Sequence, residues 1–185
     1  MTRTTRMIAV FALAISAFNG NAQTAKVLRI AMAACGPAGA LFRVDLVRKA
    51  NLPPVRADRA VVYVIGNAVH FGLGPGAPIL RVGVDGTWVG AVKGSDRPSY
   101  AAIPLRPGVH HFCVQWQGPG DATSVALNEL SLRDGNSYWL VAEGINPSGI
   151  LPPVLTLDTV NSDEGKLLVA AGRQALARKK TAAKP

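Results

Sequence analysis

The chain has 185 residues, of which 49% are hydrophobic and 17% charged, with 19 glycines and 13 prolines. This length and composition suit one domain with a real core, built from short elements joined by turns as in an all-β fold. The net charge of +9 comes mainly from the two ends, because residues 23–172 hold thirteen basic and eleven acidic residues. Such a nearly neutral body disfavours sequence-specific nucleic-acid binding.

Residues 1–22 have the layout of a secretory signal peptide. Arg3 and Arg6 give a short positive region, Met7–Phe18 is an uncharged apolar run, and Gly20 and Ala22 supply small residues. The run is too short for a membrane-spanning helix, which needs about 20 apolar residues. We therefore expect cleavage near Ala22, and a periplasmic or secreted mature protein that does not span a membrane.

The next signals predict strands. Residues 40–47 alternate loosely between apolar and polar and indicate a first strand, and a proline-containing loop is expected over residues 51–58. Ala60–Ile65 is β-branched, aromatic and continuously apolar, which is typical of a central strand buried on both faces. A glycine-rich loop is expected over residues 67–78.

The pair Asp85–Gly86 is the clearest local signal, because it lies between two apolar-alternating runs and predicts a two-residue type I′ hairpin. Two further units follow: strands over 100–105 and 109–116 around the turn 106–108, then strands over 124–132 and 137–142 around 134–136. In the run 124–132 the apolar parity changes, which predicts a bulge near Asn128 and Glu129.

The C-terminal part predicts a last strand over 152–157 and then a short helix. Asn161 is the expected cap, with Glu164 three residues later as in a capping box. We place a single domain at residues 23–172. Residues 173–185 are basic and alanine-rich, and they predict a disordered tail. The expected fold is an antiparallel β-sandwich, or a barrel-like variant, with one short C-terminal helix.

Cys35 and Cys113 are the two cysteines, and an even count in an exported chain predicts one disulfide. Phe112, Val114 and Trp116 share one parity and favour the core side, so Cys113 should face outward. A bond to Cys35 would then hold the N-terminal lead-in, residues 23–37, over the outer face. Lipid attachment at Cys35 is the alternative, but Lys26 and Arg29 interrupt the apolar segment that it needs.

Several motifs together resemble small exported bacterial β-domains. Arg81–Gly90 and Leu105–His110 are similar to a signature of PEGA-type β-modules. A longer resemblance, to a domain-of-unknown-function family of bacterial secreted proteins, covers most of the mature chain. It rests on the segments Ala34–Pro37, Ala60–Tyr63, His110–Trp116 and Asn161–Lys166. The resemblance implies an exported β-sandwich, and it implies no catalytic residues.

Metal and cofactor motifs are weak. His110 and His111 are adjacent on a predicted strand, so their side chains should point to opposite faces, and His70 is isolated in a loop. A zinc site needs three or four converging ligands, so we predict no metal. Gly72–Gly76 lacks the full glycine pattern of a phosphate-binding loop, and we predict no cofactor.

No catalytic residue is predicted. The chain contains no Gly-x-Ser-x-Gly nucleophile motif. Cys113 beside His111 could be a nucleophile, but a disulfide is favoured. A glycosidase would need two converging carboxylates in a cleft, and Asp85 and Asp134 lie in predicted turns where aspartate is structurally favoured.

Large aromatic residues are the candidate binding groups. Trp88, Tyr100, Tyr138 and Trp139 could form a stacking face for a sugar or peptide, although aromatic residues in strands are more often part of the core. Tyr138 and Trp139 are neighbours and should face opposite sides. Which of them is exposed depends on what covers the sheet.

These observations favour a non-enzymatic, exported β-sandwich module that binds or scaffolds at the bacterial cell envelope. Its partner would be an envelope polymer, a lipid surface or a protein. The alternatives are a hydrolase of an envelope polymer and a structural subunit that associates through an open sheet edge. Converging polar groups with shifted ionisation would favour an enzyme, and an apolar patch beside exposed aromatic residues would favour binding.

Overall fold

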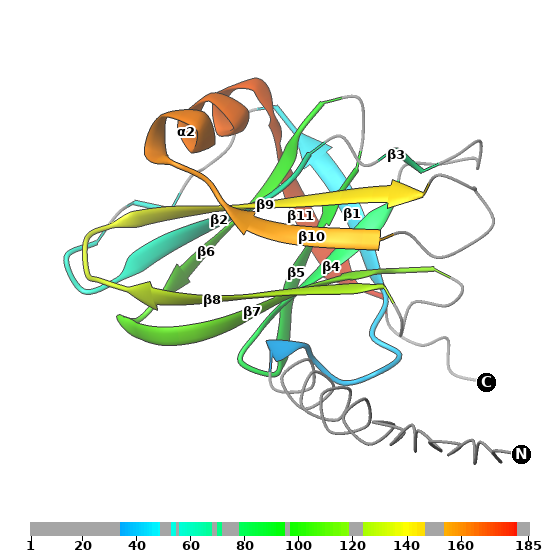
Figure 1. Ribbon diagram of the computed structural model, residues 1–185, viewed down its shortest axis with the longest axis horizontal. Coiled ribbons are helices and arrows are strands. Elements are labelled where there is room, and N and C mark those ends of the chain that lie inside the picture. The colour runs from blue at the N-terminus through cyan, green and yellow to red at the C-terminus, as the bar shows by residue number, and fades with distance from the viewer. Residues whose placement is uncertain are drawn as a thin grey trace, which may run out of the picture.

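The computed structural model describes residues 34–48, 53–54, 56–67, 70–71, 78–94, 97–118, 124–146 and 154–180. These residues are mostly β and form two sheets that are not closed into a barrel, which confirms the predicted β-sandwich (Figure 1). The expected signal peptide, the glycine-rich stretch Gly72–Gly76 and the last five residues lie outside the described residues.

The larger sheet is mixed. Its strand order is β1 (Phe42–Val47), β11 (Arg173–Lys179), β6 (Ser99–Leu105), β2 (Ala60–Gly66), β9 (Ser137–Asn146) and β10 (Val154–Thr159). A short strand, β3 (His70–Phe71), pairs with the end of β9. The pairs β2/β9, β11/β6 and β3/β9 are parallel, whereas β1/β11, β2/β6 and β9/β10 are antiparallel. The sandwich is therefore not antiparallel throughout.

The smaller sheet is antiparallel, with the order β5 (Thr87–Lys93), β4 (Ile79–Val84), β7 (Gly108–Trp116) and β8 (Val125–Leu132). Asp85 (φ 48°) and Gly86 (φ 76°) join β4 to β5, and a positive φ at both positions is what a type I′ turn requires. The predicted hairpin is confirmed. An unpredicted shift in register follows in β5, where Trp88 pairs with Gly83 and Gly90 with Val82.

The bulge predicted near Asn128 and Glu129 is absent from β8, which keeps one register against β7 from Val125 to Leu132. Leu132 and Ala126 are buried in the core, so Asn128 between them occupies a core-facing position. Its side-chain amide donates to the carbonyl of Leu157 on β10 at 2.8 Å. This hydrogen bond at the sandwich edge satisfies the polar group, and the strand needs no change of parity.

The prediction of a disordered tail from residue 173 is wrong for Arg173–Lys179. These residues form β11, which lies between β1 and β6 in the larger sheet. Ala175 is buried opposite Leu46, and Ala177 lies opposite the buried Val44, so the small residues face the core. The domain therefore extends past residue 172, because β1 needs β11 to connect it to the sheet.

β2 is buried on both faces, as its sequence predicts. Val62 and Val64 belong to the core between the sheets, whereas Val61 and Ile65 belong to a second cluster on the outer face. Helix α2 (Ser162–Ala171), which lies above the larger sheet in Figure 1, covers part of that outer face.

The predicted disulfide is confirmed, because Cys35 bonds Cys113 with the two Cα atoms 5.2 Å apart. Cys113 alternates with the core-facing Phe112 and Val114, so it faces away from the space between the sheets. The bond therefore holds residues 34–41, the described part of the lead-in before β1, over the outer face of the smaller sheet. The indole Nε1 of Trp88 donates to the carbonyl of Pro37 at 2.8 Å. A Cβ at Gly83 would come within 2.9 Å of the Cα of Cys35, so the lead-in needs glycine at this position to pack closely.

Arg81 is a buried charged residue between the smaller sheet and the lead-in, and it is only 1% exposed. Its guanidinium donates to the carbonyl of Ala40 (2.9 Å) and to the side-chain oxygen of Gln115 (2.7 Å), and it lies 4.9 Å from the ring centroid of Trp88. These contacts compensate for the loss of water around the charge. They also hold the far end of the lead-in against the sheet.

Candidate functional site

Helix α2 covers part of the outer face of the larger sheet. Asn161 is its cap, as predicted, because its side-chain oxygen accepts from the backbone N–H groups of Asp163 and Glu164, each at 3.0 Å. Gly165, in the first turn, packs directly on the indole of Trp139, and an added Cβ would overlap the ring. The glycine therefore allows the helix to lie close to the sheet.

Three aromatic rings from neighbouring strands converge beside this helix: Tyr63 of β2, Tyr100 of β6 and Trp139 of β9. Tyr63 and Trp139 are stacked, with ring centroids 6.1 Å apart and an interplanar angle of 10°. Tyr100 meets Tyr63 edge-on at 6.3 Å. The register pairs Tyr63 directly with Trp139, so adjacent parallel strands place both rings on one face. We call Tyr63, Tyr100 and Trp139 the aromatic floor.

The aromatic floor forms the base of an open cavity of about 490 Å³, within the range typical of small-ligand pockets. α2 supplies one wall. The cavity is lined by Arg48, Tyr63, Tyr100, Ser137, Trp139, Lys166, Val169, Ala170 and Gly172. These residues belong to β2, β6, β9 and α2 or directly follow β1 and α2, so the site exists only in the folded domain.

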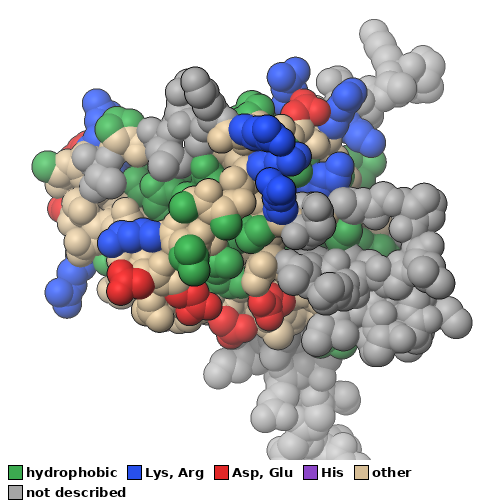
Figure 2. Space-filling view, turned by 90° about the horizontal axis from the view of Figure 1, so that it is seen from above, with side chains coloured by type: hydrophobic (Ala, Val, Ile, Leu, Met, Phe, Trp, Pro, Cys, Tyr) green, Lys and Arg blue, Asp and Glu red, His purple; other side chains and the backbone are tan. Residues whose placement is uncertain are grey.

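The rim of the cavity is positively charged. Arg48 follows the end of β1 and Lys166 lies on α2, and both are exposed. None of the described lining residues is acidic, and within the described chain neither cation forms an ion pair. Figure 2 shows Lys and Arg side chains gathered beside exposed hydrophobic side chains on the face seen from above. The arrangement suits a ligand with an anionic group and a ring.

The phenols of the aromatic floor stay protonated. Burial raises the pKa of Tyr63, and burial followed by the neighbouring Tyr63 raises the pKa of Tyr100. Neither hydroxyl is hydrogen-bonded to another described residue. Both can therefore donate to a bound oxygen, and Ser137 adds a third hydroxyl at the same cavity.

The four aromatic residues predicted as binding groups separate in the structure. Tyr100 and Trp139 line the cavity. Trp88 is 4% exposed and lies beneath the lead-in, so it is part of the buried core and not a binding residue. Tyr138 packs against the inter-sheet core, on the face opposite Trp139, and its hydroxyl accepts from the N–H of Arg133 at 2.9 Å. The predicted opposite orientation of Tyr138 and Trp139 is confirmed.

Sequence reasoning missed Tyr63, Arg48, Ser137 and Lys166. Tyr63 was part of an apolar run predicted to be buried on both faces, and it is indeed only 7% exposed. The available signal was its parity, because it shares a face with Val61 and Ile65 rather than with Val62 and Val64. The parity does not show which strands lie beside Tyr63. It also does not show that α2 leaves part of this face open.

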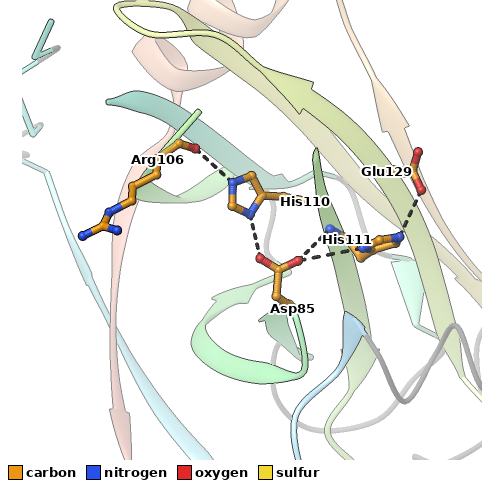
Figure 3. Close-up of polar contacts among 5 residues, drawn as sticks. All are labelled: Asp85, Arg106, His110, His111 and Glu129. Atoms are coloured by element: carbon orange, nitrogen blue, oxygen red, sulfur yellow. Dashed lines mark hydrogen bonds and ion pairs between the residues drawn. The ribbon is translucent and has the colours of Figure 1, made fainter. Parts of the chain in front are cut away.

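A cluster of polar side chains lies in the smaller sheet, around Asp85 in the β4–β5 turn (Figure 3). One carboxylate oxygen of Asp85 is 2.6 Å from Nδ1 of His110, and the other accepts from the backbone N–H of His111 at 2.9 Å. Nε2 of His110 is 2.9 Å from the carbonyl of Arg106, and Nε2 of His111 is 3.0 Å from Glu129.

The geometry of this histidine group favours a structural role. Both ring nitrogens of His110 lie within hydrogen-bonding distance of an oxygen. Neither nitrogen is then free to bind a metal or to remove a proton from a substrate. Among the described residues, no set of three His, Cys, Asp or Glu side chains could hold a metal ion.

The pKa of Asp85 is lowered. Burial is the largest single influence and would raise it, but the hydrogen bonds from the His111 backbone and the His110 ring, together with the charges of both imidazoles, outweigh burial. The ionised carboxylate is therefore favoured. It links the β4–β5 turn to β7, and we interpret this group as a clasp within the smaller sheet.

A second cavity, of about 350 Å³, is lined by Pro53, Pro54, Arg56, Arg59 and Pro104. It has two cations but no aromatic side chain among these residues. The cavity above the aromatic floor combines charge, hydroxyl donors and ring faces, so it is the better candidate for a ligand site.

Comparison with known proteins finds no matching family model, no matching curated protein and no matching solved structure. The resemblance to exported bacterial β-domains therefore stays a prediction. No helix within the described ranges is both long and apolar enough to cross a membrane.

Proposed function

We propose that this protein is an exported, non-enzymatic binding module whose ligand is an acidic sugar of the cell envelope, held in the cavity above the aromatic floor. The observation that carries the proposal is the convergence of Tyr63, Tyr100 and Trp139 with the two rim cations Arg48 and Lys166. The disulfide Cys35–Cys113 supports export, because disulfides persist in oxidising compartments.

Each part of an acidic sugar has a partner here. The apolar face of a sugar ring can lie against the exposed part of the aromatic floor, where Trp139 is less buried than the two tyrosines. Its hydroxyl and ring oxygens can accept from the phenols and from Ser137. Its carboxylate would meet Arg48 or Lys166, and hydrogen bonds between charged partners are stronger than neutral ones.

Two features favour binding over hydrolysis. The described lining residues include no carboxylate, whereas most glycoside hydrolases use a pair of them. The pKa values of Tyr63 and Tyr100 are shifted, and shifted pKa values are common in enzyme active sites. However, the shift is upward, so the phenols remain neutral donors instead of becoming bases. Neutral phenol donors can hold a ligand, and the described lining places no carboxylate beside Ser137 to activate its hydroxyl.

Association through an open sheet edge is less well supported. On the edge strand β1, the side chain of Gln117 accepts from the N–H of Phe42 at 2.6 Å and donates to its carbonyl at 2.9 Å. An incoming strand would have to displace this pair of hydrogen bonds. The chain thus protects part of the edge, as native sheets commonly do.

Isothermal titration calorimetry with digalacturonate tests the proposal, with the neutral dimer digalactose as the comparison ligand. We expect the acidic dimer to bind and the neutral dimer to bind more weakly. Arg48→Gln and Lys166→Gln should each weaken binding of the acidic dimer by about two- to fivefold, the range for exposed charge pairs. Arg106→Gln is the matched control, because Arg106 is an exposed arginine outside the cavity.

Melting temperatures of all three variants should match the parent protein, since the three side chains are exposed. The proposal is contradicted if digalacturonate does not bind at millimolar concentration. It is also contradicted if Arg106→Gln weakens binding as much as Arg48→Gln and Lys166→Gln do.

A further inference from the structure

The outer face of β1 and β11 carries an unfavourable charge arrangement. Arg43 and Arg178 are directly opposite each other in the antiparallel register, and both are exposed. Like charges at such positions destabilise a sheet. Nε of Arg43 lies 3.6 Å from Asp45, whereas Arg178 has no ion pair with any described residue. An arrangement that costs stability is explained if an anionic partner binds here.

This pair lies on the same face of the sheet as the aromatic floor. Gln174 of β11 pairs with Tyr100 of β6 and also with Val47, the residue before Arg48. Every second residue along β11 faces the same side, so Gln174, Leu176 and Arg178 form one outward row. The buried Ala175 has the opposite orientation.

The row connects the cavity to the arginine pair. From Gln174 to Arg178 the strand advances by about 13 Å, at 3.2–3.4 Å for each residue. Leu176, which is 40% exposed, lies between them and offers an apolar contact. Asp45 is opposite Leu176 and is the acidic residue on this path. We call Arg43, Asp45, Leu176 and Arg178 the strand surface.

We propose that the strand surface extends the cavity into a binding site for an acidic polysaccharide, with one sugar above the aromatic floor and a later carboxylate at Arg43 and Arg178. This inference rests on the proposed function, because it assigns the ligand a length and a direction. A polymer crosses from Arg48 at the rim, past Leu176, to the arginine pair. A single sugar in the cavity cannot reach those arginines.

The test compares two ligands on the parent protein and on Arg43→Gln/Arg178→Gln. The ligands are digalacturonate, which fits the cavity, and octagalacturonate, which also reaches the strand surface. We expect the double variant to bind octagalacturonate about fivefold more weakly or worse, with two exposed charge contacts removed. Its affinity for digalacturonate should stay unchanged. Comparing one ligand between two proteins cancels the statistical advantage of a longer chain.

A second variant works in the opposite direction. Asp45→Asn removes the carboxylate that pairs with Arg43, so it should strengthen binding of octagalacturonate and leave digalacturonate unaffected. The double variant removes the like-charge pair, so its melting temperature should equal or slightly exceed the parent value. Asp45→Asn removes one exposed ion pair, so its melting temperature should fall only slightly.

Three outcomes would overturn the inference. If octagalacturonate binds the double variant as tightly as the parent while digalacturonate also binds, the strand surface fails and the cavity stands. If neither ligand binds the parent, the proposed function fails and this inference fails with it. If the arginine pair is needed only for binding to vesicles of anionic phospholipid, its partner is a membrane and not a polysaccharide.

Discussion

Gly165 lies against the indole of Trp139 so closely that a methyl group added at position 165 would overlap the ring. This contact brings α2 down onto the sheet and sets the height of one wall of the cavity. It also explains why a residue with poor helix propensity occupies the first turn of a ten-residue helix.

Replacing Gly165 with alanine should therefore destabilise the protein. Overpacking a buried contact costs about 1–3 kcal/mol, which exceeds the 0.5–1 kcal/mol or so that alanine gains over glycine in a helix. Urea unfolding measures the change. Gly90→Ala is the matched control, because no atom lies within 4 Å of an added Cβ there. A Gly165→Ala protein as stable as the parent would show that α2 does not pack as described.

β11 offers a prediction that separates a strand from a tail. Ala175 is 8% exposed and faces the core, whereas the adjacent Leu176 is 40% exposed and faces outward. Ala175→Asp should lower the free energy of unfolding by about 2 kcal/mol or more, because it buries a charge without a partner. Leu176→Asn should have little effect, because it places a neutral polar side chain on the exposed face opposite Asp45. In a disordered tail, both substitutions would leave stability unchanged.

The misassignment of β11 shows where sequence patterns lose information. Gln174–Ala177 does alternate, but its core-facing residues are alanines, whose small side chains give a weak period-two signal. Five basic residues after Gly172 made a solvated tail the simpler interpretation. What makes these residues a strand is the presence of β1 and β6 on either side, and such long-range pairing is invisible in a local window.

Stronger local signals were sufficient elsewhere. Asp85–Gly86 predicted its turn because positive φ at both positions strongly limits the possible residues. Asn161 predicted the start of α2 for a similar reason. The aromatic floor could be predicted only in part. Parity places Trp139 on the face opposite Tyr138. The residues that line the cavity together with Trp139 come from four other parts of the chain, and the local sequence does not show that these lie nearby.

The disulfide should dominate the stability of the lead-in. Cys35 and Cys113 are 78 positions apart in the sequence, so the chain-entropy estimate of the stabilisation is roughly 4.5 kcal/mol. Urea unfolding with and without reductant should show a loss of this order, and the fluorescence of Trp88 should change as its contact with Pro37 opens. Detection of two reactive thiols in the denatured, unreduced protein would contradict the bond.

The Asp85 clasp predicts a dependence of stability on pH. Since the folded pKa of Asp85 is lowered, the ionised carboxylate stabilises the fold at pH values above the unfolded pKa of about 3.9. This contribution is lost as the pH falls through the lower, folded value. Asp85→Asn keeps the turn conformation accessible, because asparagine tolerates positive φ, and removes the charge.

The parent protein should melt at a higher temperature than Asp85→Asn at pH 6, and the difference should shrink as the pH approaches 2. Thermal melts across this range measure it. A difference that stays constant with pH would mean that the carboxylate charge does not contribute, because asparagine keeps an oxygen that can accept from the N–H of His111.

The central claim, that the cavity above the aromatic floor is the ligand site, is tested most directly by the indole N–H resonances of the three tryptophans. Titration with digalacturonate should shift the resonance of Trp139, assigned from a Trp139→Phe spectrum, in a saturable way. The resonance of Trp88 should not move, because its indole is covered by the lead-in on the other sheet. If the Trp139 resonance stays fixed while digalacturonate binds, or if only Trp88 responds, the ligand site lies elsewhere.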